Sequence, residues 1–139
     1  YTVALMREGE RHFRISSDIG ENAPIPWTAY GRLLLGHLSD QQIIDLIDYD
    51  DFILPDGQRL PLETFLAQIR QATLDGFFSF DSVADTFTHC FAAPVRDAQG
   101  ISIATLCIVA PRADALKNYN DYRRVLIDSA NNLARRINE

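Results

Sequence analysis

The two cysteines, Cys90 and Cys107, are the residues whose chemistry is easiest to place. They flank a turn-forming segment, residues 97–100, with apolar residues on both sides that favour a β-hairpin. If Arg96 pairs with Ile101 across this turn, Cys90 lies directly opposite Cys107. Opposite residues of an antiparallel pair share a face of the sheet. The thiols could then be packed core, the floor of a ligand pocket or a redox pair. The residues alone favour core, because unpaired cysteine is among the most buried residue types.

Other catalytic or metal-binding arrangements find little support in the sequence. The short motifs of serine hydrolases, zinc proteases and nucleotide-binding enzymes do not occur. A zinc site could be drawn from His89, Cys90 and Cys107, but neighbours in a strand point to opposite faces, so His89 points away from Cys90. The acidic run over residues 45–51 lacks the glycine and closing glutamate of a calcium loop. We therefore expect no enzyme, no metal and no cofactor.

The start of a helix at Thr28 is a second candidate binding position. Threonine can cap a helix, and Tyr30, Leu33 and Leu34 follow it at helical spacing. The first backbone N–H groups of a helix have no partner within the helix, and the helix dipole favours an anion beside them. A carboxylate could bind there. Every helix has such a start, so this feature alone is a weak indication of a site.

Periodicity and turn signals predict the elements that position these residues. We expect strands over residues 2–7, 11–16, 77–82, 87–95 and 101–109. We expect helices from Thr28, from Ser39, from Pro61 and over residues 120–137. Gln42 completes a capping box with Ser39, and Gly76 ends the third helix. Residues 17–26 and 110–116 read as loops. This order predicts an α+β fold, in which helices pack on a mainly antiparallel sheet.

Composition narrows the classes of protein. The 139 residues have the size of one domain, and 47% of them are hydrophobic. The net charge of −6 argues against a basic face that would bind nucleic acid. No apolar run reaches the ~18–20 residues of a membrane helix, and no secretory signal opens the sequence. Two cysteines without CxxC spacing suit a reducing cytosol. We expect a cytoplasmic domain that does not itself contact DNA or membrane.

Several segments, taken in order, resemble the effector-binding domain of IclR-type bacterial transcriptional regulators. In that family a serine-containing strand leads to a glycine, a proline and a helix start of the form A-x-G-K, and a later strand reads R-C-I-A-A-P-V. The matching segments are residues 14–20 (RISSDIG), 28–35 (TAYGRLLL), 38–42 (LSDQQ), 76–77 (GF), 89–95 (HCFAAPV) and 101–111 (ISIATLCIVAP).

This resemblance implies a GAF/PAS-like fold, a curved and mainly antiparallel sheet with helices packed on it. It implies a small-molecule effector, often a short carboxylate such as glyoxylate or pyruvate, and assembly into homodimers or homotetramers. Operator DNA would be bound by an N-terminal winged-helix domain outside this sequence. We expect residues 1–139 to be a single effector-binding domain, clipped at its N-terminal edge, whose ligand alters operator binding by the attached domain.

The resemblance also implies ligand-binding positions. The helix start falls on Ala29, Tyr30 and Gly31, and the cysteine of the later strand falls on Cys90. Two positions that usually carry hydroxyl groups fall on Cys107 and Val109, and an acidic position falls on Phe80, with Asp81 just beyond it.

Several of these residues are larger or less polar than the family's. A site built to bind a polar ligand discriminates poorly once its hydroxyl groups are gone. We therefore expect a larger or more apolar effector, an aromatic or branched acid. Two alternatives stay open. One is a dimerisation module in which Tyr30 and Phe80 fill the pocket. The other is a GAF-like thiol enzyme with Cys90 as nucleophile and Cys107 as resolving thiol.

Overall fold

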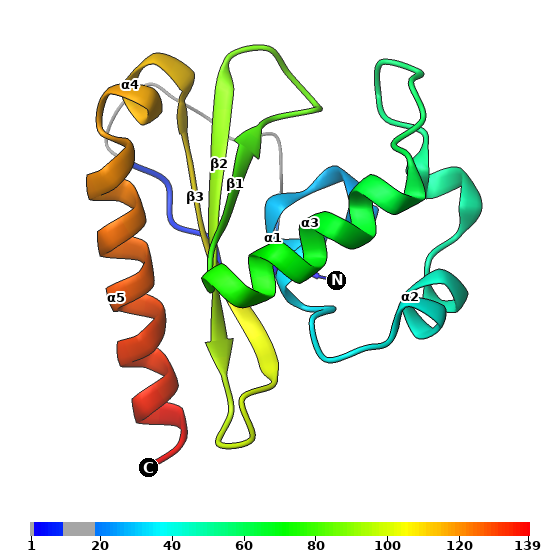
Figure 1. The fold of residues 1–139 in the computed structure, drawn as a ribbon. Coiled ribbons are helices and arrows are strands. Elements are labelled where there is room, and N and C mark those ends of the chain that lie inside the picture. The colour runs from blue at the N-terminus through cyan, green and yellow to red at the C-terminus, as the bar shows by residue number, and fades with distance from the viewer. Residues whose placement is uncertain (1, 10–18) are drawn as a thin grey trace.

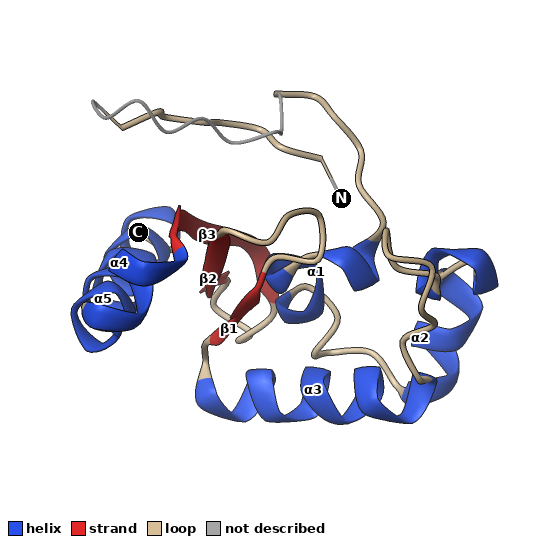
Figure 2. Ribbon diagram, turned by 90° about the horizontal axis from the view of Figure 1, so that it is seen from above, coloured by secondary structure: helices blue, strands red, loops and turns tan. Residues whose placement is uncertain are grey.

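A three-stranded antiparallel sheet is the centre of the fold, in the order β1 (Phe78–Asp81), β2 (Thr88–Arg96) and β3 (Ser102–Pro111). The computed structural model describes residues 2–9 and 19–139. Figures 1 and 2 show the long helix α5 (Tyr119–Ile137) on one face of the sheet, and α1 (Ala29–Leu33) and α3 (Leu62–Asp75) on the other. Helices packed on an antiparallel sheet confirm the predicted α+β class.

The helix starts follow the capping residues predicted from the sequence. The Thr28 side chain accepts a hydrogen bond of 3.3 Å from the Gly31 N–H at the start of α1. Ser39 and Gln42 form both hydrogen bonds of a capping box at the start of α2 (Asp40–Leu46). A short 3₁₀ turn, η1 (Ile25–Trp27), precedes α1 inside the segment that we predicted as loop.

Helix α3 (Leu62–Asp75) packs into a hydrophobic core that lies away from the sheet, together with α2 and η2 (Tyr49–Phe52). It starts directly after Pro61 and ends at Gly76, whose φ of 60° is the left-handed conformation that glycine adopts without strain. Its buried stripe packs with α2 and with η2. The members of this core are Leu35, Ile43, Ile47, Phe52, Phe65, Leu66 and Ile69. A separate cluster, in which Ala72 of α3 packs with Ala29 and Leu33, holds α3 beside α1.

The register of the β2–β3 hairpin differs from the prediction, and Cys90 does not pair with Cys107. Asp97 takes the position opposite Ile101 (N–H to O, 2.9 Å), and a bulge between Val95 and Arg96 adds a second shift of one residue. Cys90 therefore lies opposite Val109. Because side chains alternate with a period of two, two shifts of one residue leave both thiols on the same face.

Three further predictions fall at the ends of the chain. The strand over residues 2–7 is wrong, since an isolated bridge between Thr2 and Asn22 is the pairing found there. The strand over residues 11–16 lies outside the described residues. The loop over residues 110–116 is also wrong, because β3 continues to Pro111 and α4 (Arg112–Lys117) follows at once. Proline ends a strand but is well suited to the start of a helix, where its missing N–H costs nothing.

Within the described part of the chain, no helix is both long and apolar enough to cross a membrane.

Candidate functional site

The predicted site residues other than Asp81 lie either in α1 or on the face of the sheet that α1 covers. Phe80 on β1 is directly opposite Cys90 on β2, and Cys90 is directly opposite Val109 on β3. These three side chains form a row across the strands. Cys107 belongs to the adjacent row, opposite Ala92. Helix α1 contacts all three strands. The sheet thus gathers, on one face, residues that are far apart in the sequence.

This face is closed beneath α1 and open toward β3. Ala29 is fully buried and packs in one cluster with Ala92, while Tyr30, Phe80 and Cys90 pack against that cluster and are half-buried. Val109 is half-buried and Cys107 is exposed. A ligand on this face would therefore lie between the start of α1 and the edge strand β3, in contact with mainly apolar side chains.

Gly31 has a structural role that the sequence did not reveal. A Cβ at this position would lie 2.7 Å from the carbonyl oxygen and 2.8 Å from Cγ2 of Ile25, closer than real Cβ contacts allow. The Gly31 N–H is also occupied by the Thr28 cap. Glycine at this position is thus needed for η1 to lie against α1, whatever else the position does.

Asp81 lies apart from the other predicted site residues. It is opposite His89, on the face of the sheet that α5 covers. One carboxylate oxygen is 2.8 Å from Nδ1 of His89, and the other is 3.0 Å from the Arg112 guanidinium. Nε2 of His89 is buried without a partner among the described residues. As the alternation in a strand predicts, His89 points away from Cys90, so these residues do not converge on a zinc ion.

Arg32, which the sequence analysis did not single out, is buried beneath this face. Only 2% of the residue is exposed. Its Nε donates to Oε1 of Gln68 (2.9 Å), and its Nη1 donates to the carbonyl oxygen of Thr28 (2.8 Å). Burial lowers the pKa of Arg32 to about 10, so the guanidinium is charged at neutral pH. Its place after Ala29 and Gly31, where the family pattern carries lysine, was the signal that could have drawn attention to it.

The two thiols lack the features of a catalytic cysteine. Burial, with a smaller contribution from the carboxylates of Asp85 and Asp81, raises the pKa of Cys90 to about 12. Crowding by protein atoms likewise raises the pKa of Cys107 to about 12, although part of this side chain is accessible to solvent. Nucleophilic cysteines need a lowered pKa, because the thiolate is the reactive form. The arrangement therefore gives no support to a thiol enzyme.

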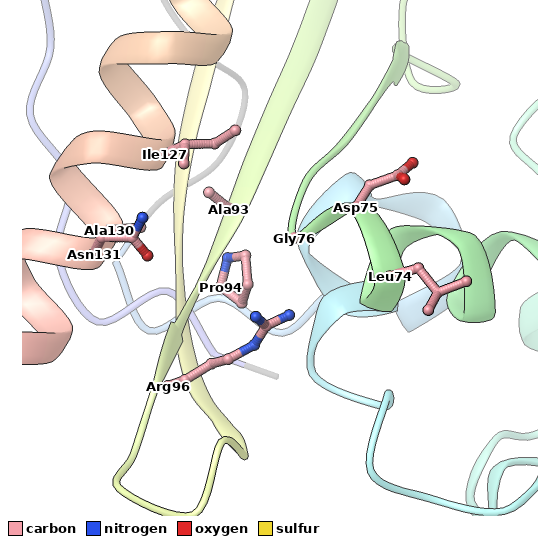
Figure 3. A pocket seen from close by; sticks show the side chains of 9 residues that line it. All are labelled: Leu74, Asp75, Gly76, Ala93, Pro94, Arg96, Ile127, Ala130 and Asn131. Atoms are coloured by element: carbon pink, nitrogen blue, oxygen red, sulfur yellow. The ribbon is translucent and has the colours of Figure 1, made fainter.

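Two hollows in the described structure lie away from the predicted site residues. One, of about 190 Å³, opens between the end of α3, strand β2 and helix α5 (Figure 3). The residues that line it are Leu74, Asp75, Gly76, Ala93, Pro94, Arg96, Ile127, Ala130 and Asn131. The other, of about 310 Å³, lies between α2 and α3 and shares Leu74 with the first. None of the predicted ligand positions lines either hollow.

Comparison with known proteins identifies the family. A family model described as "Bacterial transcriptional regulator IclR C-terminal" matches residues 6–135. The chain belongs to this family. Its members are the C-terminal, effector-binding domains of transcriptional regulators, and the resemblance noted from residues 14–111 is thereby confirmed. A search of curated proteins found no match.

Solved structures of IclR-type regulators have the same fold. The Agobacterium tumefaciens repressor BlcR aligns with a TM-score of 0.74 and 22% identity over 86% of this chain and 50% of that one. The effector domain of an IclR regulator from Acinetobacter sp. ADP1 aligns with a TM-score of 0.74 and 18% identity, over 91% of this chain and 74% of that one. The C-terminal domain of Escherichia coli KdgR aligns with a TM-score of 0.65 and 24% identity, over 86% of this chain and 71% of that one.

These identities establish the fold and not the ligand. The chain spans about half the length of the first structures it matches, 49% and 50%.

Proposed function

We propose that this IclR-type domain binds a small organic carboxylate on the α1 side of its sheet and thereby alters operator binding by an attached DNA-binding domain. The observation that carries the proposal is the convergence of Phe80, Cys90 and Val109, in one row across three strands, beside the start of α1. Four segments to which the resemblance assigns ligand positions, the start of α1 and the three strands, are thus adjacent on a partly exposed face, which supports the proposal.

The chemistry of this face favours an acid with an apolar side group. Phe80, Cys90 and Val109 offer aromatic, thiol and aliphatic surfaces, with few groups that could pair with the hydroxyl or keto groups of a small polar acid. A ligand whose polar groups stay unpaired loses affinity, whereas apolar surface gains it. An aromatic or branched acid therefore fits this face better than glyoxylate or pyruvate does.

Regulation would follow from preferential binding to one conformation of the assembled protein. A ligand shifts an equilibrium only by the difference between its affinities for the two states. In a homodimer or homotetramer, such a shift would change the spacing of the attached DNA-binding domains. The ligand can then change the free energy of operator binding by no more than the difference between its binding free energies for the two states.

A thermal-shift screen with small acids tests the proposal. A ligand that binds only the folded state raises the melting temperature by mass action. We expect isovalerate, benzoate or phenylacetate to raise it more than glyoxylate or pyruvate at equal concentration, with calorimetric titration giving each Kd. Tighter binding of glyoxylate would contradict the apolar preference. The absence of any shift on a folded sample would instead support a ligand-free dimerisation module.

A matched pair of charge substitutions locates the bound acid. Cys107→Glu adds a carboxylate to the exposed edge of the proposed site, and Leu74→Glu adds the same charge to the side chain that lines both hollows. Both positions are exposed, so both variants should fold. We expect Cys107→Glu to weaken acid binding about tenfold and Leu74→Glu to leave it within twofold. The reverse pattern would place the ligand in a hollow and refute the proposed location.

A further inference from the structure

Arg32 is a buried cation to which the described residues offer no acidic partner. The residue is 2% exposed, and no carboxylate of the described chain forms an ion pair with it. Its two hydrogen-bond acceptors are the side-chain oxygen of Gln68 and the backbone oxygen of Thr28, and both are uncharged. A buried charge without an opposite charge is costly to the fold, because water has been removed and nothing replaces its full stabilisation.

Aromatic rings replace part of that stabilisation. The guanidinium carbon lies 5.1 Å from the ring centroids of Phe65 and Phe78 and 5.3 Å from that of Phe80. The negative face of an aromatic ring attracts a cation at such distances. The three rings reduce the free-energy cost of burying the guanidinium, but they do not neutralise its charge. The interior under α1 therefore keeps an uncompensated positive charge.

This charge lies one side chain away from the proposed ligand position. Phe80, which contacts the guanidinium, is directly opposite Cys90 in the sheet. Arg32 also holds the carbonyl oxygen of Thr28, the residue that caps α1. Phe80 contacts the cation and packs with Cys90 against the cluster that contains Ala29 and Ala92, so the charge would act on a ligand beside Cys90 through its field. Fields reach further through a protein interior than through water, because the interior is less polarisable.

We propose that Arg32 makes the α1 side of the sheet selective for anionic effectors over neutral molecules of the same shape. This inference rests on the proposed function, since it concerns the ligand of the same site. A carboxylate bound over Phe80 and Cys90 would supply the negative charge that the protein does not. The corresponding amide would gain nothing from the buried cation.

Two carboxylates near Cys90, those of Asp85 and Asp81, oppose this effect. Asp81 has a side chain that is 49% exposed, and it already pairs with His89 and Arg112. Both oxygens of Asp85 accept hydrogen bonds from the Thr88 hydroxyl, and one of them also accepts from the N–H groups of Phe87 and Thr88. Charges that contact solvent are screened by water and salt, whereas a buried charge is screened much less. The acid-to-amide ratio measures the net effect of these opposing charges on a ligand at the site.

Matched acids and amides measure this selectivity directly. The probes are benzoate with benzamide, phenylacetate with phenylacetamide, and isovalerate with isovaleramide. For the unmodified protein we expect each acid that binds to do so at least tenfold more tightly than its amide. In Arg32→Gln the acid-to-amide ratio should fall about tenfold, because the amide affinity stays nearly constant. Arg32→Lys should keep most of the ratio, because it keeps the charge.

Two control variants separate charge from structure. Arg70→Gln removes the same charge from an exposed side chain that pairs with Asp40, and it should change the ratio less than twofold. Gln68→Ala removes a hydrogen bond of Arg32 and leaves the cation in place. If Arg32 only clamps α1 onto α3, Gln68→Ala and Arg32→Gln would lower acid and amide affinities together, and the ratio would not move.

The outcomes distinguish this inference from the proposed function. Acids that bind the unmodified protein no more tightly than their amides overturn the role of Arg32 and leave effector binding standing. This comparison needs no variant, so it holds even if Arg32→Gln fails to fold. An unchanged ratio in a folded Arg32→Gln protein overturns the inference as well. If neither acids nor amides bind, the proposed function and the inference fail together.

Discussion

The two faces of the sheet differ in how completely they are packed. Under α5, Phe91, Ala93 and Val95 are at most 1% exposed and lie against Leu126 and Ala130 of the helix. Under α1, the matching positions of the sheet are half-buried at Phe78, Phe80 and Cys90, and exposed at Cys107. On β2 the α5 face is closed at all three of these positions, whereas the α1 face is closed at Ala92 and only half-buried at Cys90.

Charged groups follow the same division. On the α5 side, Asp81 pairs with His89 and Arg112. On the α1 side, the buried guanidinium of Arg32 is left without an acidic partner among the described residues. The carboxylate on the α5 side is thus paired, although Nε2 of His89 stays without a partner among the described residues, whereas the buried cation on the α1 side has no carboxylate beside it. Four substitutions or reactions test this contrast.

The largest effect should come from the closed face. Phe91 is fully buried, and its ring is 5.2 Å from that of Tyr122 and 5.4 Å from that of Tyr119. Phe91→Ala should reduce the free energy of unfolding by about 3–5 kcal/mol, because it removes apolar contacts and leaves a cavity. Denaturant unfolding measures this loss. The matched variant Phe80→Ala, on the half-buried face, should lose clearly less, and equal losses would erase the contrast between the faces.

The thiol of Cys90, on the α1 side of the sheet, should be unreactive. With its pKa raised to about 12 by burial, Cys90 is almost entirely protonated at pH 8. Alkylation by iodoacetamide at that pH should be at least a hundredfold slower than that of a free cysteine, since only the thiolate reacts. Mass spectrometry in a Cys107→Ser background follows this one site. Rapid alkylation of Cys90 in the folded protein would contradict this prediction and support the thiol-enzyme interpretation.

Gly31→Ala tests whether the start of α1 is held by packing. The added methyl group would meet the backbone oxygen of Ile25 at 2.7 Å, and a backbone atom cannot move aside as a side-chain tip can. We expect a loss of about 1–3 kcal/mol in the free energy of unfolding. Gly100→Ala is a poor control because its φ of 80° is itself strained for alanine, so Gly9→Ala, with open space around it, is the better comparison. An unaffected Gly31→Ala protein would contradict the packing role.

The smallest effect should come from a single hydrogen bond on the closed face. The hydroxyl groups of Tyr119 and Ser79 lie 2.7 Å apart and join α5 to β1. Tyr119→Phe keeps the ring packing and should cost about 1 kcal/mol of unfolding free energy, without altering acid binding. A change in ligand affinity in this variant would show that the two faces are coupled through the sheet.

Local features of the fold were predictable because their causes lie within a few residues. The caps at Thr28 and Ser39, the left-handed Gly76 and the helix start after Pro61 each depend on backbone geometry over one turn or less. The alternation of side chains along β2 also sufficed to place His89 away from Cys90. The family could be recognised from such segments taken in order.

The sequence by itself therefore determined the order of the main elements, the caps of the first helices and the face to which each strand residue belongs. Tertiary structure decided the pairing of Cys90 with Val109. A bulge changes the local free energy of a strand pair only slightly, so its position depends on how the whole strands pack. Tertiary structure also decided that Asp81 pairs with His89 and Arg112 and that Arg32 lies buried among three aromatic rings. Burial of a charge depends on residues from α1, α3 and β1 at once, and no spacing within one segment encodes it.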